Sequence, residues 1–162
     1  MNLRLADELT IKLVAGLPEK AVPVSDIIVN GAPTGKRVAG ALLEAAVQWH
    51  DKYLLLTTDD CPFEEFLGIR LLDSRFNFLD SAQIGAIYNT GTFSSLELRE
   101  PNTVSFLFIG ETTWRVELLP APGVRVPFFS EPYGVWRRFS FRRHFVVHGN
   151  PQSQPRTRQD IS

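Results

Sequence analysis

The chain has 162 residues, a net charge of −1, 44% hydrophobic residues and a single cysteine. This length and composition are typical of one globular domain, the lone cysteine excludes an intrachain disulfide, and the near-neutral charge argues against a general nucleic-acid binder. The first residues lack a basic segment followed by an apolar one, and no apolar run reaches ~20 residues. We therefore expect a cytoplasmic protein that does not span a membrane.

The first elements predicted along the chain are two β-strands. Residues 9–14 alternate apolar and polar side chains with a period of two, and residues 22–29 form a second β-prone run. Asn30-Gly31 has strong turn chemistry and should end that run. Residues 31–37 share two glycines and a lysine with phosphate-binding loops, but the spacing is one residue short and arginine replaces the hydroxyl residue. We expect a turn there rather than a phosphate site.

Residues 38–49 fit two structures. A helix would place Val38, Leu42, Ala45, Ala46 and Trp49 on one stripe, whereas a strand would align Leu43, Ala45, Val47 and Trp49 on one face. The β-prone residues 53–58 follow His50-Asp51 at hairpin distance, which favours a strand hairpin. The helix remains the open alternative.

The β signal strengthens after residue 66. The apolar runs 66–72 and 76–79 are separated by Asp73-Ser74-Arg75, a connection of hairpin size. Residues 96–99, 104–109 and 114–118 are then separated by turn residues, which predicts a three-stranded meander. Because residues 104–109 are apolar on both faces, they should form its buried central strand.

The C-terminal third should contain one long loop, a last strand and a tail. Residues 120–132 are rich in proline and glycine, with a short strand expected at 124–126, and residues 139–147 should form the final strand. The polar residues 151–162 predict a disordered tail. The sequence thus predicts a mainly β, antiparallel sandwich or barrel in a single domain of residues 1–150, with room for one short helix.

Four carboxylates lie around the cysteine. Asp59, Asp60, Glu64 and Glu65 flank Cys61 and should raise the pKa of its thiol, so we expect a passive cysteine. Their clustering makes them the candidate contact for a cationic protein partner. The alternative is structural, with Asp60 capping a helical turn and the glutamates placed in its first turn.

The most distinctive stretch is residues 136–145. Strand alternation sends Phe139, Phe141, Phe145 and Val147 to one face, and Arg138, Ser140, Arg142 and His144 to the other. We favour an edge strand with a solvated basic side. The alternative is an anion or nucleic-acid site formed by Arg138, Arg142 and His144, since arginine binds phosphate in a bidentate manner.

No complete catalytic or metal-binding pattern is present. His50, His144 and His148 do not make up a zinc ligand set, and there is no nucleophile elbow. We assign no catalytic, cofactor-binding or metal-binding residue. An enzyme with dispersed catalytic residues therefore ranks third among the functions, behind a protein-interaction module and a nucleic-acid or anion binder.

As a compact β domain with no catalytic set, no targeting signal and the acidic segment Asp59–Glu65, the chain resembles bacterial toxin-immunity proteins, small cytosolic antidotes that bind a toxin domain. The resemblance covers the whole chain in general character and quotes no diagnostic motif, because these proteins have many unrelated folds. It implies a protein partner, with a cationic toxin domain as one case, and no cofactor. It carries over no site residue.

Overall fold

The computed structural model describes residues 2–18, 21–59, 66–85, 91–124, 132, 134–137 and 142–150. Within these ranges every regular element is a strand and none is a helix. The strands are β1 (Leu3–Leu5), β2 (Leu9–Leu13), β3 (Val24–Val29), β4 (Ala32–Ala39), β5 (Leu42–Trp49), β6 (Lys52–Thr58), β7 (Leu67–Leu72), β8 (Phe78–Ile84), β9 (Ser94–Arg99), β10 (Thr103–Leu107), β11 (Thr113–Val124), β12 (Val135–Arg137) and β13 (Arg142–His148).

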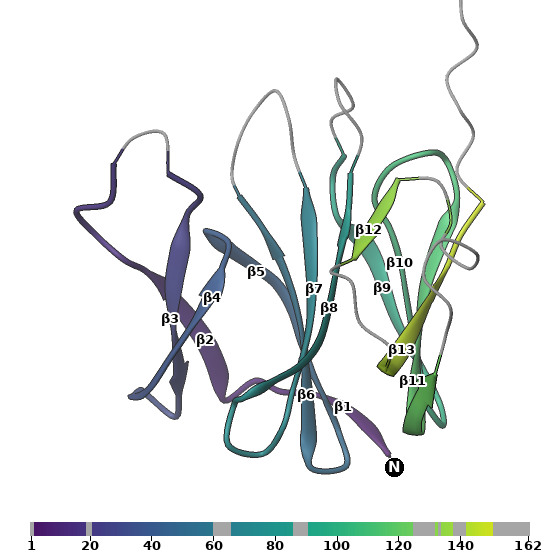
Figure 1. The fold of residues 1–162 in the computed structure, drawn as a ribbon, viewed down its shortest axis with the longest axis horizontal. Coiled ribbons are helices and arrows are strands. Elements are labelled where there is room, and N and C mark those ends of the chain that lie inside the picture. The colour runs from purple at the N-terminus through teal and green to yellow at the C-terminus, as the bar shows by residue number, and fades with distance from the viewer. Residues whose placement is uncertain are drawn as a thin grey trace, which may run out of the picture.

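These strands form three antiparallel sheets (Figure 1). The central sheet has the order β1-β5-β6-β7-β8-β12, the second has β13-β11-β10-β9, and the third has β2-β3-β4. In Figure 1 the central sheet stands between the other two, and no sheet closes on itself. The mainly β prediction is confirmed, and of its two architectures the structure has the sandwich rather than the barrel.

The central sheet is covered on both faces. One face packs Leu54, Ile69 and Leu71 against Phe106 and Trp114 of the second sheet, which forms the main core. The other face carries Leu55 and Leu72, which belong to a smaller core with residues of the third sheet such as Ile27. A strand buried on both faces has apolar residues without strict alternation. This explains the continuous apolar runs in β6 and β7.

The ambiguous residues 38–49 are extended. Strand β5 pairs with β6 in a register that ends at Trp49 opposite Lys52, so His50 and Asp51 form a two-residue hairpin loop. The favoured hairpin is confirmed. The helical stripe was misleading because this strand is covered on both faces, so Ala45 and Val47 are buried in the main core and Ala46 in the smaller one.

The predicted meander β9–β10–β11 is also confirmed. Strand β10 lies inside its sheet between β9 and β11, and Val104, Ser105 and Phe106 are buried. Leu107, at the end of the strand, is exposed. The expectation of burial on both faces therefore holds for the middle of β10 and fails at its end.

One expected turn, and the first part of one expected loop, are wrong. The turn is confined to Asn30 and Gly31, both with positive φ, and residues 32–39 continue as β4 instead of forming the longer turn predicted. In the loop expected at 120–132, residues 120–124 instead belong to β11, which pairs with β13 as far as Val124 opposite Arg142 through a register shift. Residues 125–131 lie outside the described residues, so of the short strand expected at 124–126 only Val124 is described, and it is in a strand. Strand β10 pairs with β11 only as far as Glu117. Pro120 and Pro122 follow that point, where β11 has β13 as its one neighbouring strand, so the N–H groups that prolines lack are not all needed for pairing.

The basic stretch is divided between two sheets. Residues 135–137 form β12 at the edge of the central sheet, and residues 142–148 form β13 at the edge of the second sheet. The edge position expected for the last strand is confirmed, but its predicted start at residue 139 lies outside the described residues, as does the tail 151–162.

In the part of the chain with a described structure, no helix is long and apolar enough to cross a membrane.

Candidate binding groove

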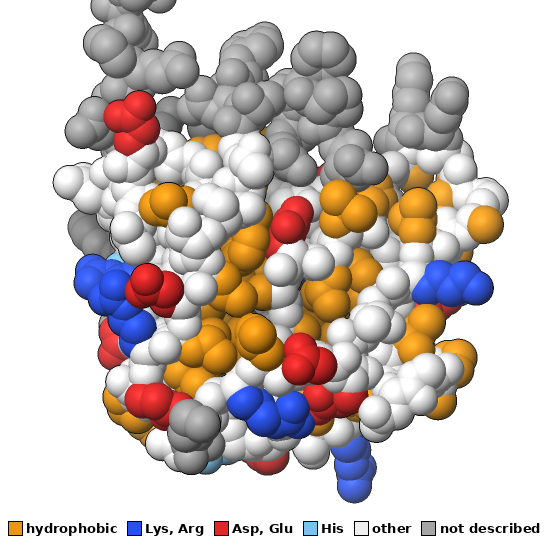
Figure 2. All heavy atoms as spheres, turned by 180° about the vertical axis from the view of Figure 1, so that it is seen from behind, with side chains coloured by type: hydrophobic (Ala, Val, Ile, Leu, Met, Phe, Trp, Pro, Cys, Tyr) orange, Lys and Arg blue, Asp and Glu red, His pale blue; other side chains and the backbone are white. Residues whose placement is uncertain are grey.

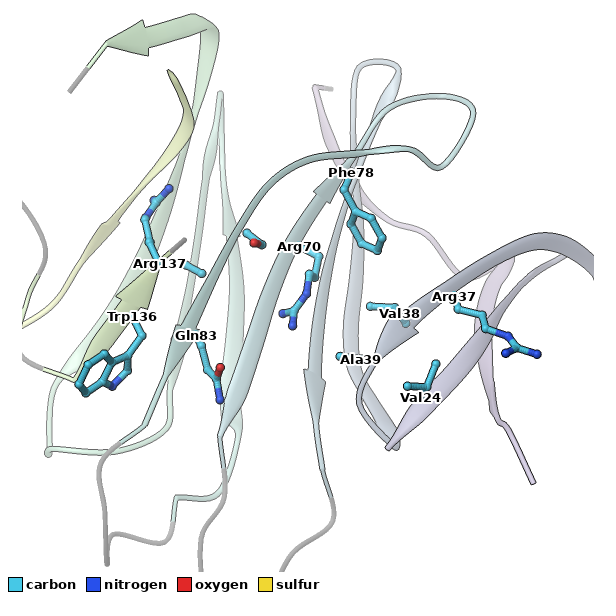
Figure 3. Close-up of a pocket in the computed structure, with 11 residues that line it drawn as sticks. Val24, Arg37, Val38, Ala39, Arg70, Phe78, Gln83, Trp136 and Arg137 are labelled. Atoms are coloured by element: carbon cyan, nitrogen blue, oxygen red, sulfur yellow. The ribbon is translucent and has the colours of Figure 1, made fainter. Parts of the chain in front are cut away.

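A groove opens where the third sheet stops covering the central one (Figure 3). Its volume is about 570 Å³, and it lies between β3–β4 on one side and β7, β8 and β12 on the other. The residues that line it are Val24, Arg37, Val38, Ala39, Arg70, Phe78, Ser81, Ala82, Gln83, Trp136 and Arg137.

Arg70 reaches the groove because of its register position in β7. Its sequence neighbours Ile69 and Leu71 point into the main core, so alternation turns Arg70 to the opposite face. A Cβ atom added at Gly68 would overlap Nη1 of Arg70, which shows that the guanidinium lies over the bare backbone of Gly68. The glycine therefore leaves the space in which this arginine side chain extends along the sheet.

Two aromatic side chains border the same groove. Trp136 is 65% exposed and Phe78 is 53% exposed, the largest solvent exposures among the described aromatic residues. Trp136 pairs with Gln83 in the β8–β12 register, and Figure 3 shows both side chains at the end of the groove away from Arg37. An exposed tryptophan beside hydrogen-bonding groups is typical of contact surfaces.

Among the described residues, the charged side chains that line the groove are all arginines. Arg137 directs its guanidinium away from the groove, since Nη1 donates to Asp80 at 2.9 Å and Nη2 to the carbonyl of Phe145 at 2.6 Å. Arg37 donates to Asp26 at 2.9 Å in an exposed pair. Figure 3 shows the Arg37 side chain pointing away from Arg70 and Trp136 as well, so among the described arginines Arg70 is the one whose side chain extends along the groove.

Of the predicted acidic contact, only Asp59 lies within the described residues. It follows β6 and is half-buried, and this burial raises the pKa of its carboxyl, while the charge of nearby Arg70 lowers it in part. Asp59 therefore belongs to the surroundings of Arg70. Asp60, Glu64 and Glu65 lie outside the described residues, as do Cys61 and the proposed helix cap, so the rest of the acidic contact stays a prediction.

The predicted basic face is described at one residue. His144 is half-buried, and its backbone N–H donates to Oδ2 of Asp80 at 2.9 Å. Arg138 and the side chain of Arg142 lie outside the described residues, so this anion site stays a prediction. Arg143, by contrast, is 5% exposed and points to the same face as Phe145, which reduces the basic surface that the sequence suggested.

The groove was not predicted from the sequence, although one signal was present. Arg70 is the single charged residue in the apolar run of β7, a run that otherwise indicates burial on both faces. The position of Trp136 could not be predicted from the sequence, because it depends on β12 joining the central sheet while β13 joins the second sheet.

Figure 2 shows the molecule from behind, where hydrophobic side chains gather over the centre and charged ones lie mostly below and beside them. Exposed apolar surface is therefore not confined to the groove, and hydrophobic residues elsewhere on the surface provide controls for it.

Among the described residues, no group of three or more histidine, cysteine, aspartate or glutamate side chains is placed to hold a metal ion. No protein-family model matches the chain, and no curated protein or solved structure matches it significantly. The groove therefore has to be interpreted from its own chemistry.

Proposed function

We propose that the protein is a protein-binding module and that the groove beside Trp136 is its contact surface. The observation that carries this proposal is the combination of a largely exposed tryptophan with an arginine-floored, partly apolar groove. Tryptophan and arginine are the residues most enriched at the energetic centres of protein interfaces. A partner that covers Trp136 would remove a large apolar surface from water, which favours association.

The composition of the groove fits a polypeptide. Val24 and Ala39 offer apolar contacts, while Gln83 and Ser81 offer donors and acceptors that can bind a main chain or polar side chains. Interfaces of this kind combine an apolar centre with a small number of hydrogen-bonding groups.

The resemblance to toxin-immunity proteins supports a toxin domain as the first partner class to test. In that case the groove, the acidic segment or both would contact the toxin, and binding would block its activity. The acidic segment starts at Asp59, which is near Arg70 of the groove, so one partner surface is able to meet both.

The experiment places a photo-crosslinking amino acid at position 136 of the full chain and irradiates the cells that produce it. We expect one dominant crosslinked protein, and we expect the same protein to bind the purified wild-type chain and to lose at least tenfold in affinity with Trp136→Ala.

Leu107→Ala provides the matched control, because Leu107 is an exposed hydrophobic residue of β10, in another sheet, and does not line the groove. Equal losses with both variants, or crosslinking of position 136 to no protein, would contradict the proposal.

A further inference from the structure

We propose that two copies of the chain associate through the outer edge of β9, as an antiparallel pair of strands related by a two-fold axis at Leu98. This pairing extends the second sheet from one copy into the other. No residue of the second sheet lines the groove, so the interaction uses a separate surface and does not depend on the proposed function.

The backbone of β9 points outward at alternate residues. Leu118 donates its N–H to the carbonyl of Asn102, so Asn102 faces β11 and, by alternation, Ser105 of β10 faces β9. Ser105 is the register partner of Glu97, whose backbone is therefore turned toward β10. The N–H and C=O groups of the next residue, Leu98, point away from β10. In the described part of the chain, no strand pairs with this outer edge.

Two nearby edges are closed by side chains. Strand β1, at the edge of the central sheet, lies beside the end of β9, where the Glu100 carboxylate accepts a hydrogen bond from the backbone N–H of Leu3 at 3.1 Å. At the other edge of the second sheet, the backbone N–H of His144 in β13 donates to Asp80 of the central sheet. An incoming strand therefore finds backbone groups available at β9 rather than at these two positions.

The side chains of β9 suit pairing with a second copy. Leu96 and Leu98 pack against the main core, whereas Glu97 and Arg99 project from the other face of the strand. Nη2 of Arg99 lies 3.1 Å from Oε2 of Glu97, and the two side chains are 56% and 62% exposed. A pair as exposed as this contributes little to stability, so each side chain can exchange its partner for one from another copy.

Charge selects one register for the two β9 strands. In such a pair, residues whose backbone groups point outward must lie opposite each other. With Leu98 opposite itself, Glu97 of each copy lies opposite Arg99 of the other. A slip of two residues in either direction places Glu97 opposite Glu97 or Arg99 opposite Arg99, and like charges at such positions are destabilising. Ser95, with positive φ at an irregularity of the β9–β10 pairing, opposes a longer slip.

The symmetry of this contact limits it to two copies, because each chain uses the same edge and no second edge of the same kind remains. Pairing also covers backbone groups that would otherwise be open to aggregation. Since two short strands make a small interface, we expect a dimer that dissociates on dilution.

Sedimentation velocity of the purified full chain over a range of concentrations tests the proposal. We expect a reversible equilibrium between monomer and dimer, with no larger species. Glu97→Arg and Arg99→Glu should each raise the dissociation constant of the dimer about tenfold or more, because both symmetric contacts change from attraction to repulsion.

Mixing the two variants gives the sharper result. Glu97→Arg carries two arginines at the edge and Arg99→Glu carries two glutamates, so a mixed pair again has opposite charges at both contacts. We expect the mixture to associate as the wild type does, and the double variant as well. Lys36→Glu is the control for Arg99→Glu, since it makes the same charge change in β4, on the far side of the central sheet (Figure 1). Trp136→Ala should also dimerise normally.

Three results would overturn the proposal. The first is a wild type that stays monomeric at every concentration. The second is a dimer that neither charge variant weakens, which would place the contact elsewhere on the molecule. The third is a mixture that fails to recover association, or an equal loss with Lys36→Glu, because neither agrees with Glu97 lying opposite Arg99 of the other copy.

Discussion

Asp80 and Arg137 form an ion pair inside the sandwich, with 2.9 Å between Oδ2 and Nη1 and side-chain exposures of only 4% and 2%. The same carboxylate oxygen accepts from the backbone N–H of His144, and Arg137 also donates to the carbonyl of Phe145, over whose ring its guanidinium lies at 4.3 Å. Asp80 is in β8 and Arg137 in β12, whereas His144 and Phe145 are in β13. The ion pair therefore links β8 and β12, at one edge of the central sheet, to β13, the edge strand of the second sheet.

Asp80→Asn should destabilise the fold strongly. The amide keeps an acceptor for His144, but it leaves the charge of Arg137 buried without its carboxylate, and such losses cost ~3–5 kcal/mol. Urea unfolding at pH 7 measures the difference. Glu97→Gln, which breaks the exposed pair with Arg99, is the control and should cost less than ~1 kcal/mol. Similar costs for both variants would show that the buried pair contributes no more than a surface one.

Phe106→Ala should cost ~3–5 kcal/mol, because Phe106 is fully buried at the centre of the main core and its ring contacts Phe93. The neighbouring Leu107→Ala should change the free energy of unfolding by less than ~1 kcal/mol, since that side chain is 39% exposed. The same unfolding measurements test both. A cost below ~1 kcal/mol for Phe106→Ala would mean that the core collapses around the missing ring.

The sequence predicted the strands better than their assembly. Local signals such as Asn30-Gly31 and the spacing of β9, β10 and β11 identify hairpins, because adjacent strands need only a short connection. The buried Asp80–Arg137 pair joins residues 57 positions apart, and no local pattern reveals it. The same holds for the groove, since Arg70 and Trp136 meet its cavity only after β12 has paired with β8.

Asp73 should make the β7–β8 hairpin sensitive to acid. Its carboxylate accepts hydrogen bonds from the backbone N–H groups of Asn77 and Arg75, each at 2.9 Å. These bonds lower the pKa of Asp73, and the bond from Asn77 has the largest effect. Because this pKa is lower in the folded state than in the unfolded chain, the ionised carboxylate stabilises the fold at pH values above the ordinary pKa of aspartate. The contribution is lost as the pH falls through the lowered pKa of the folded state.

Asp73→Asn keeps the oxygen that accepts both bonds but has no charge to titrate. We expect it to melt below the wild type at pH 7 and to approach it as the pH falls toward 2, in differential scanning calorimetry. A gap in Tm that stays constant between those pH values would show that the charge of Asp73 plays no part.

Asp59 should behave in the opposite way. Burial raises the pKa of its carboxyl, and the opposing attraction of Arg70 is the smaller effect. An aspartate whose pKa is raised in the folded state favours folding at low pH, and that advantage is lost as the pH rises through the raised value. At pH 7 the ionised carboxylate therefore opposes folding. Asp59→Asn should accordingly stabilise the protein at pH 7, by less than ~1 kcal/mol because the site is partly solvated.

The gain should vanish below about pH 3, where aspartate is protonated in both the folded and the unfolded chain. Urea unfolding of wild type and Asp59→Asn between pH 3 and 7 measures it, and Asp51→Asn is the control because Asp51 is exposed in the β5–β6 loop. If Asp59→Asn destabilises the protein at pH 7, the attraction between Asp59 and Arg70 outweighs burial.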